Sequence, residues 1–319
     1  MSTLLADRRI AVVGAGLMGH GIAQVFAEQG AEVAIHDPVS EALQSVHARV
    51  RANLEQLGRD TAAVGRIHAY DDLEEAVADA ELVIEAGPED PELKQAIFAR
   101  LDQVTAASAI LATNTSAIPI SKIAQGARER GRVLGTHWWN PPYLVPLVEV
   151  VQVADTSAHA VEQTMEMLAA AGKTPVHVRR DFPGFVGNRL QHALWREAIA
   201  LVAADVCDAE TLDTVVKQSF GLRLPAIGPL ENADLIGLDL TLAIHEQVLS
   251  AIDRTPGPSP YLQELVARGQ LGMKTGQGFR RWTPAQADAL KARVRTHLQA
   301  MTTPAGEPVG AISTPGGEQ

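Results

Sequence analysis

A histidine and a glutamate form the most suggestive pair of chemical groups in this sequence. His137 ends an apolar run and precedes residues 138–142, Trp-Trp-Asn-Pro-Pro, and Glu149 lies inside the otherwise apolar run 146–151. A carboxylate buried in such a run needs a partner. An imidazole accepts a proton near neutral pH, and a carboxylate orients it and stabilises its protonated form. The pair is therefore a candidate base for a hydroxyl proton. Spacing alone leaves open that Glu149 faces solvent and that His137 is a core residue.

A glycine-rich turn near the N-terminus has the pattern of a phosphate-binding loop. Residues 14–19 read Gly-Ala-Gly-Leu-Met-Gly, after a short apolar run and before a helix-like stretch. In such a turn the first glycine permits the tight bend, the second lets the backbone approach a pyrophosphate, and the third allows close helix–strand packing. The helix N-terminus then offers N–H groups to the phosphates. The loop residues that we expect to bind a dinucleotide are Gly14, Gly16, Leu17, Met18 and Gly19.

An acidic residue follows this turn at the distance expected for ribose recognition. The apolar run 32–36 ends at Asp37, and dinucleotide-binding turns are followed by Asp or Glu about 20 residues on. A carboxylate binds the ribose hydroxyls and repels a 2′-phosphate, and residues 38–40 supply no arginine to hold one. We therefore expect the cofactor to be NAD. The alternative is an ordinary strand–helix turn, with Asp37 as a helix N-cap before Glu41.

Strand-like and helix-like stretches alternate up to about residue 183. Strands are expected at 9–13, 32–36, 81–86, 109–113, 133–136, 147–151 and 174–178, and helices at 17–29, 91–104, 118–126 and 159–171. This alternation implies a mostly parallel sheet covered by helices on both faces. Open sheets of this kind bind ligands at the carboxyl ends of their strands, and His137 follows one of these ends.

The pattern changes after Pro183 and Gly184. Strand signals are absent there, and helices are expected at 185–206, 209–218, 234–252 and 260–269. We therefore predict an α/β protein with a Rossmann-type, doubly wound, mostly parallel sheet followed by a smaller all-helical domain. The predicted parts are an NAD-binding domain at 1–183, a helical domain at 184–300 and a disordered tail at 301–319, which is rich in Gly, Pro and Thr.

Composition narrows the class of partner. The chain has 319 residues, a net charge of −11 and one cysteine, Cys207, which excludes an intrachain disulfide. Lys and Arg do not cluster, so we expect no nucleic-acid partner. No apolar run approaches the roughly 20 residues that span a bilayer, and the N-terminus lacks a signal-peptide core. We expect a cytoplasmic protein without a membrane partner, and no set of metal ligands stands out.

Several ordered motifs resemble the 3-hydroxyacyl-CoA dehydrogenase family. The resemblance covers about residues 8–285. The motifs lie at 14–19, 83–89 (Val-Ile-Glu-Ala-Gly-Pro-Glu), 114–116 (Asn-Thr-Ser), 137–141 (His-Trp-Trp-Asn-Pro), 147–150 (Leu-Val-Glu-Val), 183–189 (Pro-Gly-Phe-Val-Gly-Asn-Arg) and 274–279 (Lys-Thr-Gly-Gln-Gly-Phe). Such a resemblance implies an NAD-dependent oxidoreductase that transfers hydride at the C3 hydroxyl of its substrate.

The resemblance also implies roles for single residues. His137 resembles the catalytic base and Glu149 the carboxylate that holds it. Ser116 and Asn188 match residues that hydrogen-bond the substrate oxygens near the nicotinamide, although a helix cap and a helix-start residue are the respective alternatives. The remaining residues matched to the cofactor site are Glu89, Lys94, Asn114, Ser116, Asn140 and Lys274.

The substrate is left open between two classes. Acyl-CoA members usually carry a longer helical excursion after the second strand, whereas the stretch 37–67 is short and holds few basic residues: Arg49, Arg51, Arg59 and Arg66. Residues 140–146, Asn-Pro-Pro-Tyr-Leu-Val-Pro, look more like the branch acting on free hydroxy acids such as L-gulonate or L-carnitine, and pyridoxate-pathway dehydrogenases are similar there. We therefore favour a free 3-hydroxy acid over an acyl-CoA. Trp138 and Trp139 offer cation–π contacts to a quaternary ammonium, with plain aromatic packing as the simpler interpretation.

The resemblance assigns the helical domain to dimerisation, and its long apolar helices need a cover, so we expect a homodimer through this domain. The alternative is that the helices pack only on each other.

Two rival classes of protein remain. A β-hydroxyacid dehydrogenase requires a catalytic lysine in the first long helix, where residues 181–213 contain none. A non-catalytic NAD-binding protein of the crystallin kind has no need of His137, Glu149, Ser116 and Asn188 together.

Overall fold

The computed structural model describes residues 5, 6 and 8–302. Their contacts divide the chain into two units: residues up to Val186 together with those from Arg295 onward, and Gly187–Val294 between them. The division falls three residues beyond the expected boundary at 183. Of the predicted tail 301–319, Met301 and Thr302 end a helix and the rest lies outside the described residues.

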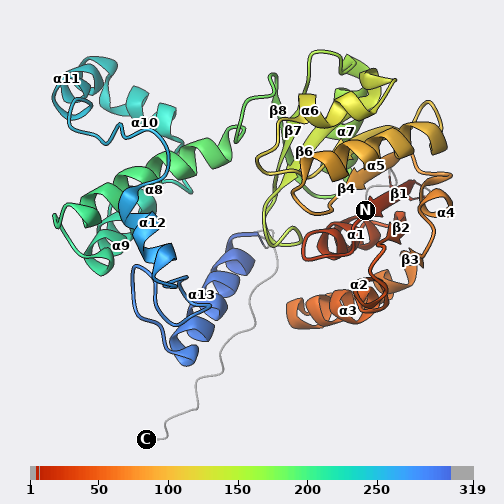
Figure 1. The fold of residues 1–319 in the computed structure, drawn as a ribbon, viewed down its shortest axis with the longest axis horizontal. Helices are drawn as coiled ribbons and strands as arrows, with labels where there is room; N and C mark the ends of the chain where they lie inside the picture. The colour runs from red at the N-terminus through yellow and green to blue at the C-terminus, as the bar shows by residue number, and fades with distance from the viewer. Residues whose placement is uncertain (1–4, 7, 303–319) are drawn as a thin grey trace, which may run out of the picture. The chain divides into compact units, whose positions relative to one another are not determined.

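The first unit is built on one eight-stranded sheet in the order β3-β2-β1-β4-β5-β6-β7-β8 (Figure 1). Its strands are β1 (Arg9–Val13), β2 (Glu32–His36), β3 (Ile67–Tyr70), β4 (Leu82–Glu85), β5 (Ile110–Thr113), β6 (Val133–Trp138), β7 (Leu147–Val151) and β8 (Thr174–Val178). Neighbours pair in parallel except β6 and β7, which run antiparallel. The predicted doubly wound, mostly parallel sheet is confirmed.

Helices cover both faces of this sheet. The α-helices of the unit are α1 (Gly19–Glu28), α2 (Ser40–Gln44), α3 (Val46–Leu57), α4 (Leu73–Val77), α5 (Pro91–Val104), α6 (Ile120–Ile123) and α7 (Ala158–Ala170), with 3₁₀ turns η1 (Thr61–Arg66), η2 (Ala124–Gly126) and η3 (Arg130–Arg132). One buried cluster joins the strands to α1, α3 and α7, and a second joins them to α4, α5 and α6. Strands β4, β5 and β6 are buried along their whole length, as expected for strands covered on both sides.

The β2–β4 connection holds several elements that sequence patterns did not predict. Strand β3 and helix α4 are only 4 and 5 residues long, too short to show a periodic signal. Asp72 caps α4 by accepting hydrogen bonds from the backbone N–H groups of Glu74 and Glu75, and Asp90 caps α5 in the same way through Glu92 and Leu93. Such side-chain caps fix where the helices begin.

The second unit is helical. It contains α8 (Gly187–Ala203), α9 (Ala209–Gln218), η4 (Phe220–Leu222), α10 (Pro229–Ile236), α11 (Leu238–Val248), α12 (Pro260–Ala267) and most of α13 (Pro284–Thr302), which was not predicted. The single helix expected at 234–252 is wrong: Gly237, with φ of +98°, ends α10 and begins α11. A left-handed φ is incompatible with a continuous helix.

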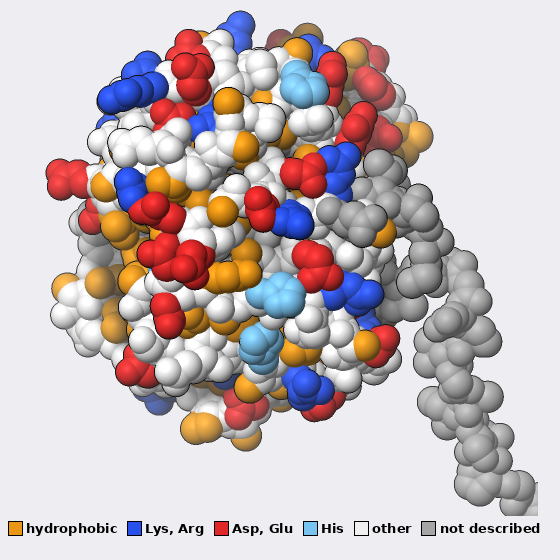
Figure 2. All heavy atoms as spheres, turned by 90° about the vertical axis from the view of Figure 1, so that its right-hand side faces the viewer, with side chains coloured by type: hydrophobic (Ala, Val, Ile, Leu, Met, Phe, Trp, Pro, Cys, Tyr) orange, Lys and Arg blue, Asp and Glu red, His pale blue; other side chains and the backbone are white. Residues whose placement is uncertain are grey.

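The surface of the protein mixes both signs of charge. On the face in Figure 2, Lys and Arg side chains lie among Asp and Glu side chains. Within the part of the chain that the structure describes, no helix combines the length and the apolar character needed to cross a bilayer.

Candidate active site

The glycine turn joins the end of β1 to the start of α1. Gly14 has a φ of +108°, and a Cβ there would lie 2.7 Å from the carbonyl oxygen of Ala86. A Cβ at Gly19 would lie 1.7 Å from the carbonyl oxygen of Gly14, so any side chain would push helix and strand apart. At Gly16 a Cβ would meet nothing within 4 Å, so this backbone borders open space. These three environments are the ones that a pyrophosphate-binding turn requires.

Asp37 follows β2 and lies against the glycine turn. One carboxylate oxygen accepts a hydrogen bond from the Ala15 N–H at 2.6 Å, and the other accepts from the Val39 N–H at 2.8 Å. The N-cap of α2 is Val39, so Asp37 does not cap that helix as the alternative interpretation required. Each carboxylate oxygen can accept a further hydrogen bond, which leaves room for two ribose hydroxyls.

Arg49 of α3 binds the glycine turn, a contact that the sequence did not predict. Its guanidinium donates to the carbonyl oxygens of Ala15, of Gly16 at 3.3 Å and of Ala42 at 2.9 Å. The His20 Nδ1 lies 2.7 Å from the same Gly16 oxygen, and burial lowers the pKa of His20. Two side chains from outside the turn thus bind the carbonyl groups of Ala15 and Gly16.

His137 and Glu149 form a buried pair at the β6–β7 junction. The two residues face each other in the antiparallel register, and the His137 Nδ1 lies 2.7 Å from a Glu149 carboxylate oxygen. Their side chains are 5% and 1% exposed, so the alternative of a solvent-facing Glu149 is excluded. The other carboxylate oxygen accepts a hydrogen bond from the Val186 N–H at 2.9 Å. Both oxygens are therefore fixed, and so is the orientation of the imidazole.

Aromatic rings flank this imidazole. The rings of Trp139 and Phe185 each lie with their centroids 5.4 Å from that of His137. Phe185 is buried with a φ of +49°, directly after Gly184 at +78°, and packs on Ile120 and Val151. A positive φ in a bulky residue is uncommon and persists only where packing holds it. The chain leaving the first unit is thus held against the histidine and its carboxylate.

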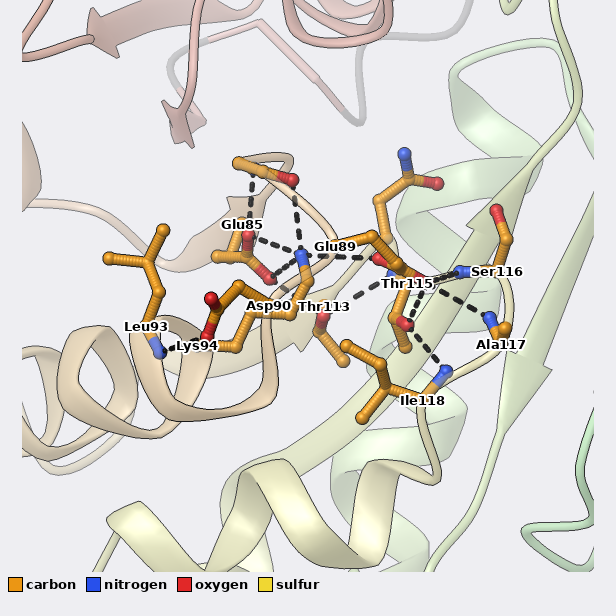
Figure 3. A network of polar contacts seen from close by, with 12 residues as sticks. Glu85, Glu89, Asp90, Leu93, Lys94, Thr113, Thr115, Ser116, Ala117 and Ile118 are labelled. Atoms are coloured by element: carbon orange, nitrogen blue, oxygen red, sulfur yellow. Dashed lines mark hydrogen bonds and ion pairs between the residues drawn. The ribbon is translucent and has the colours of Figure 1, made fainter.

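A second buried charge cluster lies at the carboxyl ends of β4 and β5 (Figure 3). The Lys94 ammonium, 1% exposed, lies 2.7 and 2.9 Å from the two Glu85 carboxylate oxygens and also donates to the Gly87 carbonyl at 3.2 Å. The Thr113 hydroxyl donates to Glu85 at 2.7 Å. Sequence reasoning assigned Lys94 to the cofactor site. The structure places it inside the protein, with three acceptors for its three N–H bonds.

Ser116 lies in the loop between β5 and α6, which wraps around the carboxylate of Glu89. One oxygen of Glu89 accepts hydrogen bonds from the Thr115 hydroxyl at 2.6 Å, the Ser116 N–H at 2.8 Å and the Ala117 N–H at 3.0 Å. Burial acts to raise the pKa of Glu89, but these hydrogen bonds and the charge of Lys94 outweigh it and lower the pKa. The same loop begins at Asn114, whose side-chain oxygen accepts from the Trp138 N–H at 3.0 Å.

The remaining predicted residues fall in three places. Asn140 is exposed in the loop after β6. Asn188 lies in the first turn of α8 and Lys274 is exposed in the turn between α12 and α13, both in the second unit. Their proposed roles stay predictions.

The first-unit groups share one edge of the sheet. Val13 pairs with His36 and with Glu85, and Glu85 with Thr113, so the glycine turn, Asp37 and the Glu85 cluster follow strand ends that lie in register. His137 lies near the carboxyl end of β6. Dinucleotides bind at this edge in open α/β sheets, and the open space at Gly16 fits such a group. The fold and site define an NAD-binding α/β protein.

Comparison with known proteins gives the family. The model of the 3-hydroxyacyl-CoA dehydrogenase NAD-binding domain matches residues 9–182, and that of the C-terminal domain of the same family matches residues 184–282. The chain belongs to the 3-hydroxyacyl-CoA dehydrogenase family and is an NAD-dependent oxidoreductase.

Relatives in this family carry different substrate names. The 5-formyl-3-hydroxy-2-methylpyridine 4-carboxylate 5-dehydrogenase of Mesorhizobium japonicum is 33% identical over 92% of this chain and 97% of its own. A solved structure of an enzyme of that name superposes with a TM-score of 0.85, covering 92% of this chain and 97% of that one. The 3-hydroxybutyryl-CoA dehydrogenase of Mycobacterium tuberculosis is 39% identical over 86% of this chain and 98% of its own. The L-carnitine dehydrogenase of Streptomyces griseus is 40% identical over 72% of this chain and 70% of its own.

Proposed function

We propose that this enzyme oxidises the C3 hydroxyl of a free 3-hydroxy acid, with His137 as the base that accepts the hydroxyl proton. The observation that carries the proposal is the 2.7 Å contact between the His137 Nδ1 and the buried carboxylate of Glu149. With its Nδ1–H donated to Glu149, the imidazole presents the lone pair of its Nε2. Glu149 then stabilises the imidazolium that forms when the proton arrives.

When bound, NAD would supply the hydride acceptor for the substrate carbon. The chain's own residues orient the reacting groups. Asp37 and the turn at 14–19 would hold the adenosine ribose and the pyrophosphate of NAD, while the Ser116 hydroxyl would hydrogen-bond the substrate oxygen. A positioned base of this kind contributes about 10²–10⁴ in rate.

Two observations support a free acid rather than an acyl-CoA. Of the four arginines in the stretch after β2, Arg49 is bound to carbonyl groups of the glycine turn and Arg59 pairs with Glu28 at 3.1 Å. These two guanidinium groups are therefore committed to the fold rather than to the phosphates of CoA. Similarity also extends over 92% of the chain to a relative whose name describes a pyridine carboxylate.

The alternative substrate is a 3-hydroxyacyl-CoA, favoured by the identity of 39% to a 3-hydroxybutyryl-CoA dehydrogenase. NADH formation at 340 nm separates the two classes when 3-hydroxybutyryl-CoA, L-gulonate, L-carnitine and free 3-hydroxybutyrate are compared at equal concentrations. A free acid with the highest kcat/KM supports the proposal. A preference for 3-hydroxybutyryl-CoA by tenfold or more contradicts it.

We also infer that the helical unit forms a homodimer. Helices α8, α10 and α11 contain no buried residue. Large apolar side chains on these helices are exposed, including Leu190, Leu230, Leu235, Leu238 and Leu242. A second copy would remove this apolar surface from water. Light scattering after gel filtration tests the inference. Twice the mass of 34.0 kDa is expected, and a monomeric mass at micromolar concentration contradicts it.

A further inference from the structure

We infer that Glu89 is a positioning residue for Ser116, holding the loop 114–118 so that the serine hydroxyl meets the substrate oxygen. This inference rests on the role proposed above for Ser116. It gives Glu89 a task that differs from direct contact with the cofactor, which is the role that family resemblance implied.

The geometry around Glu89 is that of a loop folded onto an anion. A single carboxylate oxygen accepts three hydrogen bonds, two of them from the consecutive backbone N–H groups of Ser116 and Ala117. The third comes from the hydroxyl of Thr115, which in turn accepts from the N–H of Ile118 at 3.0 Å. Four consecutive residues are therefore tied, directly or through one hydroxyl, to one oxygen atom of Glu89. Hydrogen bonds to an ionised acceptor are about twice as strong as neutral ones.

The positive charge of the buried Lys94 favours the ionised form of the Glu89 carboxylate. The Lys94 ammonium lies 3.7 Å from the second oxygen of Glu89 while it is bound to Glu85. Because its three N–H bonds already have acceptors on Glu85 and Gly87, Lys94 acts on the site through Glu85 and Glu89. Glu85 is anchored from the other side by Thr113, which begins the segment that leads into the Ser116 loop. The cluster thus links the ends of β4 and β5 to the loop.

The position of the serine follows from these contacts. Its backbone N–H points to Glu89, and its side chain extends away from the Glu89 carboxylate (Figure 3). Glu89 itself is 42% exposed, so water competes for its oxygens as soon as the loop opens. Loss of the carboxylate would release the N–H groups of Ser116 and Ala117. The serine hydroxyl could then move away from the substrate oxygen that we propose it binds. Misplacement by about 1 Å costs as much as 10²-fold in rate.

A double-mutant cycle tests the inference. The variants are Ser116→Ala, Glu89→Ala, the double variant and Glu89→Gln, assayed at saturating NAD with the substrate that turns over fastest in the panel above. We expect Ser116→Ala to lower kcat/KM by about 10–100-fold, because it removes a hydrogen bond to the reacting oxygen. Glu89→Ala should cost about tenfold, and the double variant should equal Ser116→Ala within about twofold, since Glu89 acts through the serine.

Glu89→Gln provides the rescue, because its amide oxygen keeps an acceptor at the same place. It should return kcat/KM to within about threefold of the wild type. The matched control is Glu92→Ala, which removes an exposed carboxylate from the same helix. It should leave all rates unchanged. Titration with NADH alone, followed by its fluorescence, should show affinities within about threefold of the wild type for Glu89→Ala.

The outcomes separate this inference from the proposed function. If the losses of Glu89→Ala and Ser116→Ala multiply in the double variant, or if the loss appears in NADH affinity instead, the positioning role is wrong. If Ser116→Ala retains full activity, the proposed role of Ser116 fails, and the positioning role in catalysis falls with it.

Amide hydrogen exchange of the protein without cofactor gives a readout that needs no substrate. The amides of Ser116 and Ala117 should exchange at least tenfold faster in Glu89→Ala and at nearly wild-type rates in Glu89→Gln. Unchanged exchange in Glu89→Ala would show that the loop does not depend on this carboxylate.

Discussion

His137 and Glu149 lie directly opposite each other on β6 and β7, the one antiparallel pair in the eight-stranded sheet. Cross-strand neighbours in an antiparallel pair bring their side chains within about 5 Å when they share a face of the sheet. The reversal of one strand therefore provides the contact between base and carboxylate without any help from a loop. It also fixes the contact rigidly, since both strands are buried.

The first prediction concerns the base. His137→Ala should lower kcat by about 10²–10⁴, the usual contribution of a positioned general base, and NADH affinity should survive. Steady-state kinetics and NADH fluorescence measure the two effects. His159→Ala, which alters an exposed histidine at the start of α7, serves as the control. Unchanged turnover in His137→Ala would remove this residue from the mechanism.

The second prediction concerns Glu149. Glu149→Gln keeps the shape of the side chain but presents one amide N–H₂ group where the wild type has two acceptors for His137 and Val186. One of the two contacts is lost, and the imidazolium loses its counter-charge. We expect kcat to fall by about 100-fold with little change in the KM for NAD. The exposed Glu162 provides a control in Glu162→Gln. A kcat within threefold of the wild type would mean that the carboxylate only supports the fold.

Sequence patterns predicted those parts of the fold that have a clear period or a sharp boundary. The ranges of β1, β2, β7, β8, α5 and α9 agree with the sequence. Strands β1, β2 and β7 and helix α5 are bounded by Gly, Pro or Asp, and α9 begins at its Asp208 cap. By contrast, α13 has only one buried residue, so its pattern carries little signal.

The site was predictable to the extent that it consists of motifs. The contact between His137 and Glu149 was expected and is present, because two apolar strands joined by a loop place their residues opposite each other. The contacts of Arg49 with the glycine turn, and the burial of Lys94, were not predicted. Arg49 and Gly16 lie 33 residues apart, and a charged side chain in a helix gives no sign of which carbonyl groups it reaches.

The third prediction tests cofactor preference. Asp37→Ser removes the carboxylate that repels a 2′-phosphate and that we expect to accept the ribose hydroxyls. The ratio of kcat/KM for NAD to that for NADP should fall by about tenfold or more, mainly through loss of NAD binding. Asp71→Ser, at an exposed position outside the site, is the control. An unchanged ratio would indicate that Asp37 only supports the turn through Ala15 and Val39.

The fourth prediction concerns the buried ion pair of Lys94 and Glu85. Lys94→Met leaves a fully buried carboxylate without its cation, and such a loss typically costs about 3–5 kcal/mol. The free energy of unfolding in urea should fall by that amount, and the Lys94→Met/Glu85→Gln double variant should recover most of it. Lys122→Met, on the exposed side of α6, is the matched control. Equal stability of Lys94→Met and the wild type would contradict the assignment of the pair as a structural ion pair.

The fifth prediction concerns the dependence of stability on pH. The Lys173 ammonium donates to the carbonyl oxygens of Pro142 and of Val145 at 3.1 Å, in the loop that follows β6, and lies 5.6 Å from the Trp138 ring. Burial, with the nearby charge of Arg59, lowers the pKa of Lys173 to about 8, against the opposing effect of Glu28. In the unfolded chain the pKa is that of an ordinary lysine, 10.5.

Between these two values the unfolded state binds a proton that the folded state does not, so the free energy of unfolding rises with pH. Below pH 8 both states are protonated and the dependence vanishes. The stability of the wild type relative to Lys173→Met should therefore be constant up to about pH 7.5. Above that pH it should increase by at most about 1.4 kcal/mol per pH unit towards pH 10.

Taking the difference between the two proteins cancels the titration of all groups that they share. Urea unfolding at pH 7, 8.5 and 9.5 measures it, with Lys122→Met as the comparison whose difference from the wild type should stay flat. If the difference between Lys173→Met and the wild type is equally flat, the pKa of Lys173 lies near that of a solvated lysine. The claim that burial lowers this pKa would then be wrong.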